Sequence, residues 1–128
     1  MDTVYAAFDD GVVSGPDFDT GADTLEWHAH PTFAGVALKH LVTGKDTDNR
    51  FSVHLVRLEP GAEIGHHVHE TNWELHEVMA GSGRCRLLDR DMDYRCGVVA
   101  VMPESAGHSV HAGPDGLCLF AKFIPALM

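Results

Sequence analysis

The chain has 128 residues, 45% of them hydrophobic, which suits one domain built around a single packed core. Nineteen acidic and nine basic residues give a formal charge of −10 with no run of lysine or arginine. This balance excludes the basic footprint that binding to nucleic acid or to an anionic membrane requires, and no apolar run approaches the ~20 residues of a membrane span.

The three cysteines, Cys85, Cys96 and Cys118, are an odd number without CxxC spacing. Neither a disulfide framework nor a cysteine-type zinc site is therefore expected. We interpret them as buried, reduced thiols of a cytoplasmic protein. The acidic residues 1–11 lack the basic segment and apolar core of a secretory signal, which agrees with that location.

Residues 1–34 are predicted to form an irregular N-terminal arm, because the first 22 are rich in aspartate and glycine and include Pro16. His28 and His30 form a His-x-His pair near the end of this arm. No glutamate follows them at a ligand-like spacing, so we interpret both as loop or surface residues. The predicted barrel domain then occupies residues 35–128.

The remaining chain consists of short β-type runs separated by turns rich in glycine, proline and aspartate, with no long helical period. This pattern predicts an all-β barrel or sandwich. Strands are predicted at residues 35–42, 50–58, 64–69, 73–79, 84–88, 95–102, 108–111 and 117–123. Turns are predicted at residues 43–49, 80–83, 89–93, 103–107 and 112–116.

The predicted strand at 50–58 has two faces, and the sequence leaves open which of them points inward. One face carries Phe51, Val53, Leu55 and Arg57, and the other carries Ser52, His54, Val56 and Leu58. If the first face is inward, Arg57 would be placed to hold a carboxylate substrate. If the second is inward, His54 would enter the cavity.

A candidate metal site follows from the spacing of four polar residues. His67 and His69 are two residues apart, so on a strand their side chains share one face. Glu74 begins the next predicted strand, and His108 opens a later one. A closed antiparallel barrel would bring these strand starts together, and three imidazoles with one carboxylate suit a divalent transition metal such as Fe, Mn, Ni, Cu or Zn.

His76 is the candidate catalytic residue. It lies two residues beyond Glu74 and shares its face on a regular strand, where it would serve as a general base or contact the substrate. The alternative interpretation is a hydrogen-bonded interior histidine. The strand parity and spacing place four further side chains outward, namely His66, Trp73, Glu77 and His111.

These residues resemble the first conserved motif of the cupins, G-x5-H-x-H-x3,4-E-x6-G. Every fixed position of that motif is matched, by Gly61, His67, His69, Glu74 and Gly81. The match is specific because five positions over 21 residues carry the required types.

The second cupin motif, G-x5-P-x-G-x2-H-x3-N, is matched by Gly97, Pro103 and His108. Ser105 replaces the usual glycine and Ala112 replaces the usual asparagine, and neither change removes a ligand. The chain thus resembles a small single-domain cupin of the RmlC-like superfamily over residues 35–124.

The resemblance implies a double-stranded β-helix, or jelly-roll barrel, that holds a divalent metal, binds a small molecule and forms a homodimer. The apolar C-terminal residues 123–128 would seal that dimer. Cupins include dioxygenases, lyases, isomerases, decarboxylases, storage proteins and sugar sensors, so the fold does not select a reaction. We interpret the chain as a small-molecule metalloenzyme of dioxygenase, lyase or isomerase type. The alternatives are a non-catalytic module that binds a sugar or organic acid, and a purely structural barrel.

Overall fold

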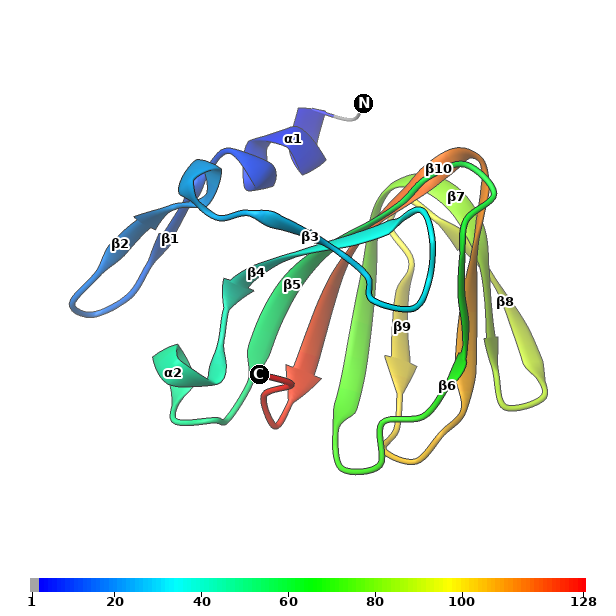
Figure 1. Ribbon diagram of the computed structural model, residues 1–128. Helices are drawn as coiled ribbons and strands as arrows, with labels where there is room; N and C mark the ends of the chain where they lie inside the picture. The colour runs from blue at the N-terminus through cyan, green and yellow to red at the C-terminus, as the bar shows by residue number, and fades with distance from the viewer. Residues whose placement is uncertain (1–2) are drawn as a thin grey trace.

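The computed structural model describes residues 3–128 and consists mainly of β-strands (Figure 1). In chain order the elements are α1 (Thr3–Asp9), β1 (Val12–Ser14), β2 (Asp19–Gly21), η1 (Ala22–Thr24), β3 (Trp27–Ala29), β4 (Val36–Val42), α2 (Gly44–Thr47), β5 (Ser52–Leu58), β6 (Glu63–His67), β7 (Trp73–Leu87), β8 (Arg90–Arg95), β9 (Val99–Met102) and β10 (His108–Ile124). The all-β prediction is confirmed. In the part of the chain that the structure describes, no helix is long and apolar enough to cross a membrane.

Two long strands, β7 and β10, organise an antiparallel sheet of eight strands. The sheet runs β3-β4-β5-β10-β7-β8, with β6 paired to β10 and β9 paired to β7. The first part of β10 pairs with β6 and its last part with β5, while β7 pairs first with β9 and then with β8. Because each long strand changes partners midway, the sheet curls over itself and encloses an interior (Figure 1).

The turns predicted at residues 80–83 and 112–116 are wrong, because β7 and β10 continue through both segments. The pairing of these strands shifts register between Ala112 and Leu117, which is a β-bulge rather than a chain reversal. Gly81 and Gly116 both have φ +78° at this bulge. The glycines that suggested turns in the sequence instead allow two paired strands to bend and approach each other closely.

The polar segment between β7 and β9 also differs from the prediction. Residues 89–93 were expected to form a turn, but β8 occupies Arg90–Arg95 and pairs with the second half of β7. The reversal is shorter: Leu87 pairs with Arg90, and Leu88 has φ 55°. Charged residues are tolerated in β8 because it is an edge strand with most side chains exposed.

The N-terminal segment, predicted to be irregular, contains α1, the β1–β2 hairpin, η1 and β3, which extends the main sheet by pairing with β4. Tyr5 is only 1% exposed and packs against the outer side of the sheet with Leu55, Met79, Ala80 and Cys118. The Lys39 ammonium pairs with the carboxylate of Asp9 at 2.5 Å and bonds the carbonyl of Ala22 at 2.8 Å. The domain boundary at residues 34 and 35 stays a prediction.

The open question about β5 has a clear answer. Val56 and Leu58 belong to the interior apolar cluster with Val36, Val78 and Leu119, so the face that carries His54 is the inward one. The Arg57 guanidinium instead lies 4.3 Å from the Trp27 ring centroid on the outer side. Arg57 is therefore not placed to hold a substrate inside the barrel.

Candidate metal centre

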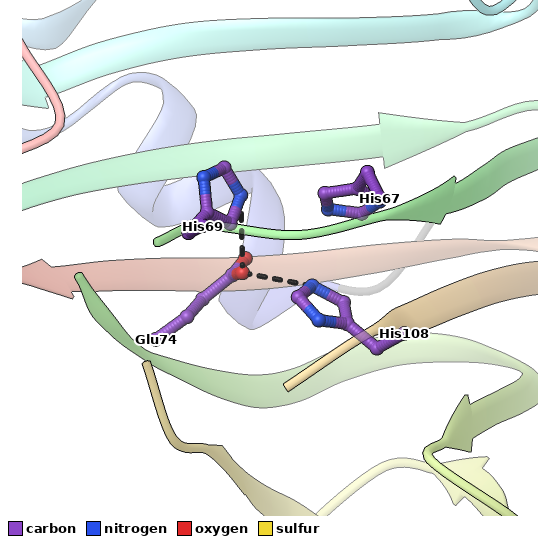
Figure 2. A group of neighbouring side chains, drawn as sticks. All are labelled: His67, His69, Glu74 and His108. Atoms are coloured by element: carbon purple, nitrogen blue, oxygen red, sulfur yellow. Dashed lines mark ion pairs between the residues drawn. The ribbon is translucent and has the colours of Figure 1, made fainter. Parts of the chain in front are cut away.

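The four predicted ligand residues meet inside the barrel (Figure 2). His67 ends β6, His69 follows it in the adjoining loop, Glu74 lies at the start of β7 and His108 opens β10. The pairing of β6 with β10 sets His67 directly opposite His108. One potential ligand atom from each of the four residues lies within 4.8 Å of the other three, so the convergence expected from the spacing is present.

Backbone carbonyls fix the tautomer of two of the imidazoles. Nδ1 of His67 bonds the carbonyl oxygen of Gly65 at 2.8 Å, and Nδ1 of His108 bonds that of Ala106 at 3.1 Å. A carbonyl oxygen only accepts, so Nδ1 carries the hydrogen in both rings. Nε2 of each neutral ring then keeps its lone pair for a metal ion, which is the usual orientation of a ligating histidine.

The centre fits a cation because it contains buried polar atoms without partners. Oε1 of Glu74 lies 3.0 Å from Nε2 of His108 and 3.5 Å from Nε2 of His69 (Figure 2). Both Oε1 of Glu74 and Nε2 of His108 are buried and lack a hydrogen-bond partner among residues 3–128. Leaving such atoms unsatisfied costs about 1–3 kcal/mol each, whereas a bound divalent metal would satisfy both.

The electrostatics of the centre favour an ionised carboxylate at Glu74 and neutral imidazoles at His67 and His69. Burial alone would raise the pKa of Glu74, but His76 and His108 together hold it well below its usual range. Burial lowers the pKa of both His67 and His69. Burial would also lower the pKa of His108, but the adjacent Glu74 raises it, so a metal ion would compete with a proton at this position.

A cavity of about 100 Å³ adjoins the centre. His67, His69, Glu74 and His76 line one part of it, and apolar side chains from β4, β5, β6 and β10 form most of the rest. His30 and Leu127 complete the lining. The cavity is thus polar at the ligand cluster and at His30 and apolar elsewhere, as in many small-molecule sites.

His76 is held on both sides. Its Nε2 lies 2.6 Å from Oε2 of Glu74, and its Nδ1 lies 2.8 Å from the hydroxyl of Tyr94. Because a carboxylate accepts, Nε2 donates to Glu74 and Nδ1 accepts from Tyr94. Tyr94 had no signal in the sequence, since most of its strand is predicted to be a turn and no motif marks it.

His28 and His30 lie outside the metal cluster, as predicted. His28 is exposed and stacks on His40 with 5.3 Å between ring centroids. His30, however, is half-buried and lines the cavity, where its Nδ1 accepts the backbone N–H groups of Thr32 and Phe33 at 3.1 and 3.2 Å. Its proximity to the cavity depends on the fold of the 30–35 loop and had no signal in the sequence.

The predictions of outward and buried side chains were mostly confirmed. Of the four residues expected to point outward, Glu77 is half-buried and the other three are exposed: His66, Trp73 and His111. Within residues 3–128 none of the three cysteines forms a disulfide, and Cys85 and Cys118 are buried. The prediction of a buried Cys96 is wrong, because the turn after β8 carries it to the surface.

His54 is fully buried but is not among the residues that line the cavity, and it forms a polar chain of its own. Its Nδ1 lies 2.7 Å from Nδ1 of His40, and its Nε2 lies 2.9 Å from the hydroxyl of Ser52. Burial, assisted by His40, lowers the pKa of His54 from 6.5 to about 4. The ring is therefore neutral in the folded protein at neutral pH.

We expect His54 to make the protein less stable as the pH falls from about 6.5 to about 4. In that window the unfolded chain binds a proton at this residue and the folded chain does not, so the loss is on the order of 3 kcal/mol. Urea unfolding at pH 7.5, 5.5 and 4.5, with chelator present, should show a smaller loss for His54→Gln than for the wild type. The exposed His111→Gln should follow the wild type, and equal losses in all three proteins would contradict the assignment.

Comparisons with known proteins identify the fold. No family model and no curated protein matches the chain. Among solved structures, an RmlC-like cupin from Shewanella frigidimarina superposes with a TM-score of 0.73 at 18% identity, covering 88% of this chain and 94% of the other.

Two other similar structures carry enzyme names. A predicted oxalate decarboxylase from Thermotoga maritima gives a TM-score of 0.71 at 24% identity, over 79% of this chain and 91% of the other. The polyketide cyclase RemF from Streptomyces resistomycificus gives 0.70 at 21% identity, over 80% and 75%. The chain therefore has the cupin fold, a jelly-roll barrel, and the resemblance to small RmlC-like cupins is confirmed at the level of the fold.

Proposed function

We propose that this protein is a small-molecule metalloenzyme of the dioxygenase, lyase or isomerase type. A divalent transition metal would be held by His67, His69, Glu74 and His108. The observation that carries the proposal is the pair of buried, unpartnered atoms, Oε1 of Glu74 and Nε2 of His108, within a cluster of four ligand atoms. When bound, such a metal acts as a Lewis acid on a substrate oxygen.

The protein contributes orientation and the exclusion of water. His76 and Tyr94 hold Oε2 of Glu74 in place, which leaves Oε1 to face the imidazoles. The apolar walls of the cavity remove water from the substrate and strengthen every electrostatic interaction at the centre. Two of the similar structures are named as a predicted oxalate decarboxylase and a polyketide cyclase. These names support small-molecule chemistry for the fold but do not select a reaction.

Elemental analysis of the protein purified from metal-replete cells tests the proposal. We expect close to one divalent metal per chain in the wild type and almost none in His67→Ala or His108→Ala. His111→Ala is the matched control, because His111 is exposed and lies outside the cluster. A wild-type protein without metal, or either cluster variant that keeps it, would overturn the assignment.

A non-catalytic binding module is the second candidate, and the contacts of the two further histidines in the cavity favour it. Both ring nitrogens of His76 are already bonded, and Nδ1 of His30 accepts two backbone N–H groups. Neither ring therefore presents a free basic nitrogen to a substrate in this arrangement. Saturable binding of a sugar or organic acid without product, in metal-loaded protein, would support the module over the enzyme.

The general-base role of His76 stays a prediction. The variant His76→Gln tests the alternative role, in which His76 positions Glu74 for the metal. We expect the metal affinity of this variant to fall about tenfold, because its side chain cannot bridge Glu74 and Tyr94 as the imidazole does. Competition with a metal-binding dye measures that affinity. Tyr94→Phe should weaken binding in the same direction by less, and His66→Gln, at an exposed residue, should not change it. Unchanged metal affinity in His76→Gln would contradict the positioning role.

We also propose a cytoplasmic homodimer. The outer side of β7, β9 and β10 exposes four large apolar side chains, which are 46–59% exposed: Trp73, Val99, Val101 and Ile124. Such a patch is typical of a surface that associates. Light scattering should give twice the mass of the chain, and a monomer at micromolar concentration would overturn the dimer. The cytoplasmic location is supported by the three cysteines, which form no disulfide among the described residues.

A further inference from the structure

We infer that the ligand of this centre is a small, singly charged oxygen chelator with a short apolar remainder, and that Leu127 limits the length of that remainder. The inference rests on the proposed metal centre and goes beyond it. It follows from three features of the cavity: its charge, its size and the C-terminal residues that close it.

The charge of the centre can balance one negative charge on a ligand. A divalent metal and the Glu74 carboxylate sum to a single positive charge, since metal-bound imidazoles are neutral. Among residues 3–128, no lysine or arginine lines the cavity. Lys39 pairs with Asp9 and Arg57 lies over Trp27, both away from the interior. A second negative charge on the ligand would be buried without a partner, which costs several kcal/mol.

The apolar walls and the small volume of the cavity indicate the character and size of the remainder of the ligand. The side chains around the ligand cluster are aliphatic or aromatic, among them Val56, Ile64, Leu119 and Phe123. Burying an apolar group against them gains about 25 cal/mol per Å² of surface. The volume of about 100 Å³ is well below the roughly 300–1,000 Å³ of pockets for drug-sized ligands. It suits on the order of five to eight non-hydrogen atoms.

The C-terminal tail, residues 125–128, sets the depth of the cavity. The N–H of Leu127 bonds the Ser52 hydroxyl at 2.9 Å, the N–H of Ala126 bonds the carbonyl of Asn49 at 3.1 Å, and the amide of Asn72 bonds the carbonyl of Pro125 at 2.8 Å. These bonds hold the tail as a short loop at the end of β10, on the side of β5 (Figure 1). The Leu127 side chain lines the cavity while remaining 38% exposed, so it lies at the opening.

Pyruvate and oxalate form the matched pair that tests the charge. They have the same shape and the same two chelating oxygens, but a methyl group in pyruvate replaces a charged oxygen. The dissociation constant of each is measured by calorimetry for zinc-loaded protein and for aqueous zinc, because the free ion itself prefers the dianion. We expect the preference for oxalate to be at least about tenfold smaller in the protein. A preference as large as that of the free ion would overturn the charge argument.

Phenylpyruvate tests the role of Leu127. We expect the wild type to bind it at least about tenfold more weakly than pyruvate, and Leu127→Ala to remove most of that difference. Met128→Ala is the control, because Met128 is in the same tail but is exposed and does not line the cavity. Equal binding of the two ligands by the wild type, or no gain in Leu127→Ala, would overturn this role.

Zinc content is measured on the same samples. A protein that never holds zinc refutes the metal centre itself, whereas a zinc-loaded protein with the wrong ligand preference refutes only this inference.

Discussion

Saturating divalent metal should raise the melting temperature of this protein by on the order of 10 °C, and Glu74→Gln should abolish most of that rise. The metal binds the folded chain and not the unfolded one, so a concentration 1,000 times the dissociation constant stabilises the fold by about 4 kcal/mol. For a domain of this size, 1 kcal/mol corresponds to roughly 2–8 °C. Thermal unfolding with excess metal and with chelator measures the difference.

The size of the effect comes from the state of the centre without metal. Two buried atoms, Oε1 of Glu74 and Nε2 of His108, then have no hydrogen-bond partner in the part of the chain that the structure describes. A glutamine at position 74 keeps the volume of the glutamate but removes its charge, and an amide is a poor ligand for a transition metal. The variant should therefore melt at nearly the same temperature with metal and with chelator.

Glu63→Gln is the control for the loss of a carboxylate. Glu63 is on β6 near the cluster but is exposed, where it pairs with His111 at 3.4 Å. This variant should keep the full metal-dependent rise, because surface ion pairs contribute little to stability. A wild-type protein whose melting temperature is unchanged by chelator would contradict the metal centre and favour a purely structural barrel.

The ligand cluster was predictable from the sequence because it depends on local geometry and a few strand pairings. His67 and His69 share a side by the two-residue period of extended chain, and Glu74 follows after one reversal. The proline loop before His108 marks the start of another strand. Antiparallel pairing then placed His108 opposite His67, as a closed barrel requires.

The surroundings of the cluster were not predictable, because they depend on contacts between distant segments. Tyr94 reaches His76 only because β8 pairs with the second half of β7. Leu127 lines the cavity only because the tail bonds residues on other elements, and it had been assigned to a dimer interface instead. Periodicity and turn composition describe neighbours in sequence, so they give no signal for such contacts.

The bulge in β7 also depends on a contact between distant segments, so it had no signal in the sequence. We expect Gly81→Ala at this bulge to destabilise the protein by more than about 3 kcal/mol. Gly81 has φ +78°, and a Cβ there would lie 2.1 Å from the carbonyl oxygen of Gly116. The left-handed conformation costs about 1–2 kcal/mol for a residue with a side chain, and the clash with backbone adds a comparable amount or more. Urea unfolding measures the loss, and a change below about 1 kcal/mol would contradict the close approach of β7 to the backbone of β10.

Gly61→Ala separates the two contributions. Gly61 is the first glycine of the same sequence motif and has φ +75°, but a Cβ there would meet nothing within 4 Å. Its substitution should therefore cost only the conformational part, about 1–2 kcal/mol. Two glycines that look equivalent in the motif thus serve different purposes: Gly61 allows a turn in open space, and Gly81 lets β7 lie close against the backbone of β10 at Gly116. If both variants lost the same stability, the glycine at position 81 would be required only for its positive φ and not for the close contact with Gly116.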